Sequence, residues 1–572
     1  MYRLMRFILR STLLLIGYVT VLTIIIIPYA WVVAAALVIV AMCKKGYRYT
    51  AYGTARFADV SDIPHMLEGN GLIVGHIDGK ISRVDGVKAL FNPRMSAKDA
   101  CQKFLTTCQR KQPKQLVRLT HAVHTAVFAP TGLGKGVSIV VPHLLTCPDS
   151  MVVVDFKGEL VTITADARRK MGQRVVVLDP FGLVGGKDTF NALDFIDKES
   201  HTAIDECRDL AEALVLRTGQ EKEPHWADSA EVWIAAMIST VVCYAEDSDK
   251  SLQSVRALLT NPEKMQAAIK LMCESGLWQG MLSRLGHQLA HFKDKELSST
   301  LTTTNRFMRF LDTIAISDNT RSSSFDPAEL KKGKMTIYLV LPLDHTRTQS
   351  PMLRMWLGSM LRACLRGGLN NTNKIYYICD EAYTLGKMDQ IADVLTYGRS
   401  YGICLLMLYQ DCGQLRKCWP DGADQTLLAN CTQVFFGVND QQTAEYVSNR
   451  LGEFTQVVTS GGSSYGGSSQ ESSGQSGSSH TRSWNSNDNW QQAGRKLLRP
   501  EEVTGLSERI AITFTPGAPP IWTRLIRYYE DSFKTKRGIG LLKSVVDTAC
   551  LFLTALFLAV LFTALLTQQT YR

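Results

Sequence analysis

The sequence predicts an α/β fold built on a mostly parallel β-sheet. A Gly-rich stretch, 129–136, follows the apolar run 125–128 and precedes an apolar segment of helical character, which is the strand–turn–helix context of a phosphate-binding loop. Two later apolar runs, 150–155 and 174–179, each end in an aspartate. Unbroken apolar runs are typical of parallel strands buried on both faces, and open α/β sheets bind ligands at the carboxyl ends of their strands.

The Gly-rich stretch reads Ala-Pro-Thr-Gly-Leu-Gly-Lys-Gly. Backbone N–H groups of such a turn at a helix N-terminus point at anionic oxygens, and the lysine ammonium reaches the terminal phosphates. We therefore expect ATP to bind at Thr131, Gly132, Leu133, Gly134, Lys135, Gly136 and Val137. The alternative is an ordinary strand-to-helix turn with a solvent-facing lysine.

Two positions of this loop depart from the usual motif. Ala129 replaces the first glycine, and Gly136 stands where a Ser or Thr hydroxyl normally meets Mg²⁺. The hydroxyl of Ser138 is one candidate for the missing metal ligand, and a water molecule is the other.

Composition places the chain among globular proteins with several domains. Its 572 residues leave room for several domains of about 150 residues each. The 14 cysteines are scattered without a zinc-like spacing, as in proteins whose thiols face a reducing cytosol. A net charge of +10 is compatible with polyanion binding but does not establish it, because basic residues beside a membrane account for much of the excess.

The N-terminal region predicts a membrane hairpin. An apolar run over 7–43 is interrupted by Pro28 and has basic residues on both sides. Two short crossings of about 17 residues each would keep both basic flanks in the cytoplasm, whereas a single crossing would leave one outside. A cleaved signal peptide is a further alternative, but the apolar stretch exceeds the length of such a segment. We assign residues 1–45 to this hairpin.

The C-terminal region predicts a third membrane span. Residues 548–566 are almost continuously apolar and follow a basic segment that begins at Lys534. The rival interpretation is an amphipathic helix packed on the soluble part of the chain. Such a helix should have a strongly polar face, yet the polar side chains of 551–566 are only the hydroxyls of Thr554 and Thr563. We assign residues 536–572 to a C-terminal transmembrane segment.

Between these ends the hydrophobic period changes twice. A helical period begins after 190, and Asn261-Pro262 is a typical helix start. Strand signals return at 335–342 and 374–381. We therefore expect a nucleotide-binding domain in two parts, 46–190 and 322–535, with an all-helical insertion at 191–321. A Ser/Gly-rich stretch, 459–492, reads as a flexible loop because it has too little apolar surface to fold.

The run 374–381 ends in Asp380-Glu381. One carboxylate after a strand can hold Mg²⁺ and the next can polarise an attacking water. An acid pair alone is weak evidence, but with Lys135 it favours a site that hydrolyses a nucleoside triphosphate. Asp155, with Lys157 and Glu159 close behind it, could also face the nucleotide, although helix capping or a solvated turn explains these charges equally well.

Two further polar residues lie downstream of the acid pair. Gln410 follows the apolar run 403–408, so its amide could sense the γ-phosphate. Arg399 lies between the acid pair and that run, and an arginine there could reach the phosphate of a neighbouring subunit. A surface salt bridge is the alternative role of Arg399, and spacing does not decide between the two.

Short motifs recur in order through most of the chain: Gly53–Arg56, 129–136, Asp155–Glu159, Asp179–Gly182, Asn191–Asp194, Asp380-Glu381, Gly398-Arg399, Asn439–Ala444, Arg495–Glu502 and Pro519–Ile521. Together they resemble the TraG-type coupling proteins of type IV secretion and conjugation systems. These proteins are membrane-anchored relatives of RecA-like and FtsK-like DNA motors. Gly136 fits this resemblance, since the family often carries a glycine after the lysine.

The resemblance implies a RecA-like ATPase in the bacterial inner membrane, with its motor domain in the cytoplasm and an all-alpha domain that meets the substrate. The implied partners are single-stranded DNA with relaxosome proteins, or protein effectors, and the secretion channel; a homohexamer is implied too. The implied catalytic residues are Lys135 on phosphate, Asp380 on Mg²⁺, Glu381 on water, Gln410 on the γ-phosphate and Arg399 as a finger across subunits. The C-terminal span departs from the family, whose anchor is N-terminal.

Two other functions compete with an ATP-driven conjugation pump. One is an FtsK-like pump for double-stranded DNA, which lacks support because the C-terminal region shows no winged-helix pattern. The other is a membrane docking receptor that uses nucleotide as a structural switch and turns over little. Glu381 and Gln410 argue against that receptor, because a switch has no need of groups that activate water.

Overall fold

The structure is a computed structural model that describes residues 50–78, 114–120, 123–217, 223–369, 372–469 and 480–530. These residues belong to two compact units. The sheet unit contains the described residues of 56–451 and 498–530, and the hairpin unit contains those of 50–55 and 452–497. The membrane spans expected within 1–45 and 536–572 lie outside the described residues and stay predictions.

An 11-stranded sheet forms the centre of the sheet unit. Its order is β2 (Lys114–Leu119), β1 (Leu72–Asp78), β13 (Ile521–Arg524), β12 (Ile510–Phe514), β9 (Cys431–Phe436), β3 (His124–Phe128), β8 (Ile403–Tyr409), β7 (Ile375–Cys379), β4 (Ser150–Asp155), β6 (Met335–Val340) and β5 (Arg174–Leu178). All neighbours from β9 to β5 are parallel, and all those from β2 to β9 are antiparallel. The predicted α/β fold with a mostly parallel sheet is confirmed.

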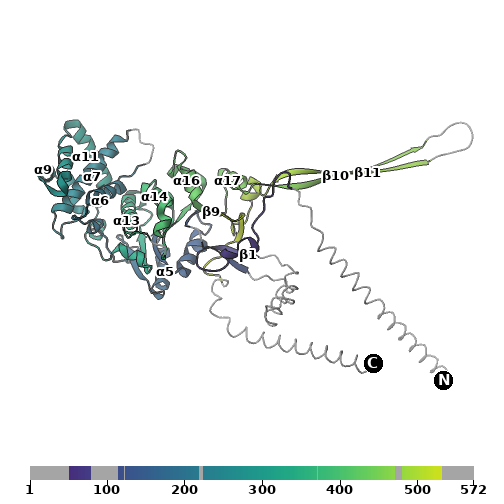
Figure 1. Cartoon of the computed structure of the whole chain (residues 1–572), viewed down its shortest axis with the longest axis horizontal. Coiled ribbons are helices and arrows are strands. Elements are labelled where there is room, and N and C mark those ends of the chain that lie inside the picture. The colour runs from purple at the N-terminus through teal and green to yellow at the C-terminus, as the bar shows by residue number, and fades with distance from the viewer. Residues whose placement is uncertain are drawn as a thin grey trace, which may run out of the picture. The chain divides into compact units, whose positions relative to one another are not determined.

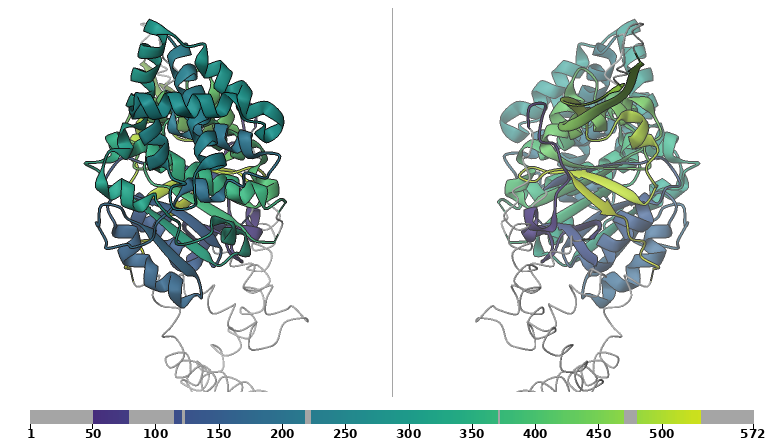
Figure 2. Two further views of the ribbon diagram at one scale, coloured as in Figure 1. Left: turned by 90° about the vertical axis from the view of Figure 1, so that its left-hand side faces the viewer. Right: turned by 90° about the vertical axis from the view of Figure 1, so that its right-hand side faces the viewer.

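The parallel strands are apolar because helices cover them. Every residue of β3, β4, β6, β7, β8 and β9 is buried. Figure 2 shows helices on both sides of the sheet, with the late strands, coloured yellow, in the same sheet as the early ones. A strand without a solvent face gains nothing from alternating polarity, so its sequence reads as a continuous apolar run.

In the described residues between β5 and η7, helices are the only regular elements. They are η4 (Ala192–Phe195), α6 (Ala203–Leu214), α7 (His225–Tyr244), α8 (Leu252–Thr260), α9 (Pro262–Cys273), η5 (Leu277–Gly280), α10 (Met281–Ala290), α11 (Asp294–Met308), η6 (Arg309–Leu311) and α12 (Ile314–Asn319). Figure 1 shows α6, α7, α9 and α11 gathered together, away from β1. The described residues of the insertion predicted at 191–321 form helices. It is not separated from the sheet as a compact unit of its own.

The predicted start of α9 is also confirmed. The side-chain oxygen of Asn261 accepts hydrogen bonds from the backbone N–H groups of Glu263 and Lys264, at 3.0 and 3.1 Å. Pro262 occupies the first turn, where its missing N–H costs nothing. Within the described residues, α7 is the one helix long and apolar enough to cross a membrane. Because 72% of its apolar window is buried, α7 is better explained as the core helix of the insertion.

The remaining helices surround the sheet or join its strands. They are η1 (Val60–Asp62), η2 (Pro64–Met66), η3 (Gly136–Val140), α4 (Val141–Thr146), α5 (Glu159–Lys170), η7 (Pro327–Lys332), α13 (Thr346–Arg366), η8 (Ala382–Leu385), α14 (Asp389–Tyr397), η9 (Gly398–Tyr401), α15 (Cys412–Cys418), α16 (Ala423–Asn430), α17 (Gln441–Leu451) and α18 (Pro500–Thr504). α4 and α5 pack on the same core as the parallel strands through Val141, Leu144, Leu160 and Ala165.

The hairpin unit is a two-stranded antiparallel ladder of β10 (Glu453–Ser469) and β11 (His480–Lys496). We expected a flexible loop over 459–492 that has too little apolar surface to fold. In the structure the backbone pairs in register from 453 with 496 to 469 with 480. A ladder needs only backbone N–H and C=O groups, so a Ser/Gly-rich composition does not prevent it. The flexibility of this stretch stays a prediction.

A buried histidine in α4 makes the stability of the sheet unit depend on pH. His143 is 0% exposed, and neither ring nitrogen has a hydrogen-bond partner among the described residues. Burial lowers the pKa of His143 to about 3. Below about pH 6.5 the unfolded chain binds a proton that the folded chain refuses, so the free energy of unfolding should fall by about 1.4 kcal/mol per pH unit from this group.

His143→Phe should remove that dependence. Urea unfolding of the full chain in detergent at about pH 7.5 and about pH 5.5 measures it. The variant should lose less stability on acidification than the wild type, whereas His291→Phe, which replaces an exposed histidine, should keep the wild-type dependence. Equal decreases in the wild type and the His143 variant would contradict the assignment.

Candidate functional site

The predicted phosphate-binding loop leaves β3 at its carboxyl end and runs from Ala129 to the first helical residue, Gly136. Gly132 and Gly134 have φ angles of 84° and 90°, which favour glycine because other residues are strained there. A Cβ added to Gly132 or Gly136 would meet no atom within 4 Å. The loop therefore borders open space on the side where a phosphate would lie.

The helix after the loop begins with the wide turn η3, and the backbone N–H of Ser138 donates to the carbonyl oxygen of Gly134 at 2.9 Å. The first N–H groups of a helix have no intrahelical acceptor and attract anions. The seven residues expected to bind nucleotide are consecutive in this loop and turn. Thr131 and Gly132 are exposed, and the rest are partly or fully buried.

Lys135 folds back across the loop. The residue is 7% exposed, and its ammonium donates to the carbonyl oxygen of Ala129 at 2.8 Å. The same nitrogen lies 3.9 Å from Oε1 of Glu381. Burial lowers the pKa of Lys135, while Glu381 and Asp380 act in the opposite direction. The alternative of a solvent-facing lysine does not fit this geometry.

The acid pair follows β7 at the same edge of the sheet. Burial, and then the charge of Glu381, raises the pKa of Asp380 to about 6. Glu381 has a φ of 64°, an unfavourable value for a residue with a side chain, and it immediately precedes η8. Gln410 follows β8, and its Nε2 donates to Oε2 of Glu381 at 3.3 Å. Lys135, Glu381 and Gln410 thus meet from three neighbouring strands, β3, β7 and β8.

The structure separates the two roles that the sequence left open for Asp155. Its carboxylate is 2% exposed and accepts backbone hydrogen bonds from Lys157, Gly158 and Val161 at 3.1, 2.8 and 3.0 Å. Asp155 therefore closes the turn between β4 and α5, which is the capping alternative. Lys157 is exposed, and its charge acts on both Lys135 and Asp380.

Ser138 is placed behind the loop. It is 1% exposed, and its hydroxyl has no hydrogen-bond partner within the described part of the chain. Two residues are about half a turn of the wide helix η3, so Ser138 and Gly136 face nearly opposite sides. Gly136 faces the open space, and Ser138 faces the core.

Arg399 does not join the other site residues within this chain. It is exposed, and it lies in η9 immediately before β8 begins. Gln410 follows the carboxyl end of the same strand, so Arg399 and the loop lie at opposite edges of the sheet. From this position the arginine cannot reach the Lys135 loop of its own chain.

Two residues near the site carry no signal in the sequence. Arg354 of α13 is 4% exposed and donates to the carbonyl oxygens of Leu385 and Lys387, at 2.8 Å each, in the loop after the acid pair. Arg527 follows β13, and its Nε lies 3.9 Å from the position of a Cβ on Gly134. Both contacts join segments far apart in the sequence, so local pattern could not have found them.

Known proteins resemble this chain over most of its length. The profile of a family described as "Type IV secretory system Conjugative DNA transfer" matches residues 75–548. Conjugal transfer protein TraG of Agrobacterium fabrum is 27% identical over 424 residues, covering 73% of this chain and 62% of that protein. Protein VirD4 of Rhizobium radiobacter is 25% identical over 485 residues, covering 84% of this chain and 64% of that protein. The chain thus spans less than two thirds of the length of these relatives.

Solved structures share the fold. The bacterial conjugative coupling protein TrwBdeltaN70 in its unbound form has a TM-score of 0.53 at 16% identity, covering 70% of this chain and 84% of that one. The plasmid coupling protein TrwB in complex with ADP and Mg²⁺ has a TM-score of 0.54 at 17% identity, covering 74% and 92%. At such identities the likeness supports the α/β fold with its large, mostly parallel sheet.

The geometry of the loop predicts that Gly134→Ala weakens nucleotide binding by about tenfold or more, because a Cβ there would be strained and would lie 3.0 Å from Cγ2 of Val137. Gly172→Ala is a matched control, since Gly172 has a φ of 82° but open space around its Cβ position. Titration with a fluorescent ATP analogue measures the affinity. If Gly172→Ala lost as much affinity as Gly134→Ala, the loss would come from backbone strain in general and not from a change in the loop.

Proposed function

Because this chain belongs to the type IV secretory system conjugative DNA transfer family, we propose that it is a coupling ATPase of the bacterial inner membrane. It receives single-stranded DNA bound to a relaxase, or a protein effector, and drives it into a type IV secretion channel. The names of its relatives TraG and VirD4 and the nucleotide complexes of TrwB support this proposal.

The observation that carries the proposal is the meeting of Lys135, Glu381 and Gln410 at one edge of the sheet. Lys135 is a buried cation at a loop that can hold phosphates, so it neutralises their charge. Glu381 is a carboxylate that accepts protons from a water molecule, and Gln410 orients Glu381 or the γ-phosphate. A loop that only bound nucleotide would not need the last two groups.

The residues present also fit a Mg²⁺ ion. Asp380 supplies a carboxylate beside the loop, where burial and the charge of Glu381 raise its pKa. A bound cation would favour the charged form of this carboxylate. Gly136 offers no hydroxyl, and Ser138 faces the core, so this placement favours water over Ser138 as the remaining ligand. When bound, Mg²⁺ would offset the negative charge of the β- and γ-phosphates.

Arg399 acts across a subunit boundary in this proposal. Its exposed position at the edge opposite its own phosphate loop is suited to a neighbouring subunit. The proposed assembly is a homohexamer, in which each nucleotide would lie between two chains. Anchoring by an N-terminal hairpin and a C-terminal span would keep this assembly on the cytoplasmic face of the membrane.

The competing functions make different demands on the site. A docking receptor that uses nucleotide as a switch would bind ATP without turnover, so it would not need the contact of Gln410 with Glu381. An FtsK-like pump would hydrolyse ATP in the same way but would act on double-stranded DNA. The family to which the chain belongs favours conjugative transfer over that pump.

Complementation between two inactive variants tests the proposal. Lys135→Ala should abolish ATP hydrolysis and conjugative transfer while the protein stays in the membrane, because the substitution removes only the ammonium that binds phosphate. Arg399→Ala should bind ATP but hydrolyse it poorly. Mixed assemblies should regain part of the activity, since some boundaries then combine an intact loop with an intact arginine.

ATP hydrolysis by purified mixtures measures this recovery, and a mixture of Lys135→Ala with Lys135→Ala/Arg399→Ala is the control. The control contains no intact loop and should stay inactive. Wild-type turnover by Lys135→Ala alone would refute the nucleotide site, whereas failure of verified mixed assemblies to recover would refute only the role of Arg399 across subunits.

A further inference from the structure

A cleft with a volume of about 1010 Å³ opens in the sheet unit between the helical insertion and the carboxyl ends of β5 and β6. Its lining comes from α7, α11, η6, the start of α13 and the turn after β5. None of the residues assigned to the nucleotide site lines it. β5 and β6 are parallel neighbours, so the cleft lies at the same edge of the sheet as the phosphate loop.

The cleft has an excess of positive charge. Arg306, Arg309 and Arg347 line it and are exposed, and none of them forms an ion pair within the described residues. The two acids of the lining are already engaged. Glu223 accepts a hydrogen bond from the indole N–H of Trp226 at 2.6 Å. Asp312 accepts hydrogen bonds from Nε and Nη2 of Arg256, at 2.8 and 2.6 Å. The arginines are thus left to attract an anion from outside.

Flat rings lie beside these charges. Phe181, from the turn after β5, stacks on His345, which precedes α13, with ring centroids 4.4 Å apart and an interplanar angle of 20°. Phe181, His345 and Trp226 are partly exposed and line the cleft. Nucleic-acid bases stack on such rings whatever their sequence.

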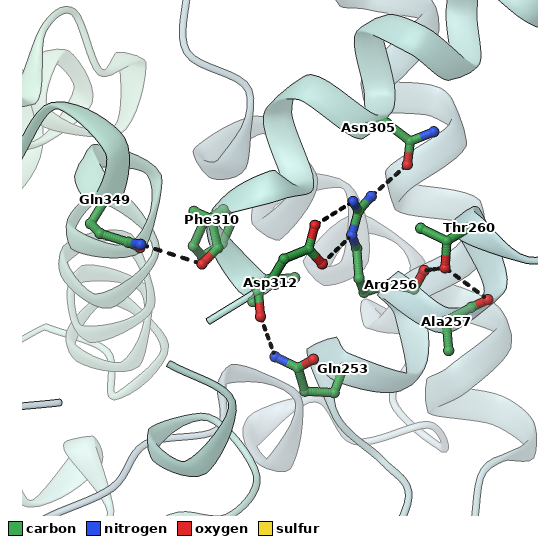
Figure 3. A network of polar contacts seen from close by, with 9 residues as sticks. Gln253, Arg256, Ala257, Thr260, Asn305, Phe310, Asp312 and Gln349 are labelled. Carbon is green, nitrogen blue, oxygen red and sulfur yellow. Dashed lines mark hydrogen bonds and ion pairs between the residues drawn. The ribbon is translucent and has the colours of Figure 1, made fainter. Parts of the chain in front are cut away.

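The turn that bears Arg309 is fixed in place before any ligand binds. Figure 3 shows Arg256 between Asp312 and Asn305, so that the side chain joins α8 to α11 and to the segment after η6. Gln349 donates to the carbonyl oxygen of Phe310 at 3.4 Å from the other wall of the cleft. One hydrogen bond therefore joins two walls of the cleft.

The turn that bears Phe181 is fixed as well. The carboxylate of Asp179 accepts the backbone N–H groups of Leu183 and Val184 at 2.9 and 2.7 Å. This acid ends an apolar strand, like Asp155, and its role is to fold the turn that places the aromatic ring. The site is thus preorganised, which lowers the entropic cost of binding.

We propose that this cleft binds a short stretch of single-stranded nucleic acid, with phosphates on the three arginines and bases stacked on Phe181 and Trp226. Arginines on three separate elements suit an anion that is extended, as a phosphate backbone is. Paired bases in a duplex expose no faces to the rings, and an acidic peptide has carboxylates but no rings of its own. The inference rests on the proposed function in taking DNA as cargo, and it locates one binding site for it.

The full chain in detergent tests this inference with a fluorescein-labelled oligothymidine of about 20 nucleotides, whose binding is followed by anisotropy. Arg309→Gln/Arg347→Gln should bind the oligonucleotide at least about tenfold more weakly than the wild type. The negative slope of log affinity against log salt should become shallower by about 0.7 for each phosphate that is no longer neutralised. Arg208→Gln/Arg284→Gln removes the same charge from exposed positions of α6 and α10 outside the cleft. That control should bind within about twofold of the wild type.

Phe181→Leu separates stacking from charge. It should weaken oligothymidine binding by about fivefold or more while leaving the salt dependence at its wild-type slope. The same decline in both arginine doubles would mean that net charge, and not the cleft, attracts DNA, which would overturn the inference.

A labelled decaglutamate peptide tests whether the cleft binds an acidic protein segment instead of DNA. If the cleft double variant loses affinity for this peptide but keeps its affinity for oligothymidine, the site binds an acidic protein segment and the inference is wrong. Failure of the cleft also differs from failure of the proposed function, because Lys135→Ala should keep wild-type affinity for oligothymidine while losing ATP hydrolysis.

Discussion

The register of three parallel strands is the constraint on which the site depends. β3 pairs with β8 so that Phe128 lies beside Tyr409, and β8 pairs with β7 so that Met407 lies beside Cys379. The backbone N–H of Ala129 extends the ladder by donating to the carbonyl oxygen of Tyr409 at 3.1 Å. A slip of one residue would turn every side chain of a strand to the opposite face. The contacts that Glu381 makes with the loop lysine and with the glutamine after β8 exist only in this register.

Helix α13 links that site to the rest of the sheet unit. The residues at its start, up to Pro351, line the cleft beneath the helical insertion. One turn later, buried Arg354 donates to two carbonyl oxygens in the loop after the acid pair and, at 3.1 Å, to that of Ala213 in α6. A movement of the acid-pair loop would have to displace this guanidinium or break its hydrogen bonds. The acid-pair loop, the helical insertion and the cleft therefore all contact one helix, α13.

Local pattern predicted the parts of the fold that have a strong period. The buried parallel strands are visible in the sequence as apolar runs, and Asn261-Pro262 predicts the start of α9. Pattern failed where distant segments meet: β12 and β13 enter the sheet beside β9 and β1, and Arg527 reaches the loop from there. It also left Asp155 undecided, because a carboxylate that closes a turn and one that faces a ligand have the same sequence context. The fold gives the positions of the site residues, but their roles are inferred from the chemistry of their side chains.

The central claim is that the acid pair and the lysine loop form a site that hydrolyses ATP and does not merely bind it. Steady-state ATP hydrolysis by the purified full chain, with and without single-stranded DNA, tests this claim most directly, with Glu381→Gln as the comparison. The wild type should turn over on the order of one ATP per second and be stimulated by DNA, while Glu381→Gln should bind ATP with wild-type affinity and hydrolyse it at least about a hundredfold more slowly. Tight ATP binding by the wild type without turnover, or wild-type turnover by Glu381→Gln, would contradict the account.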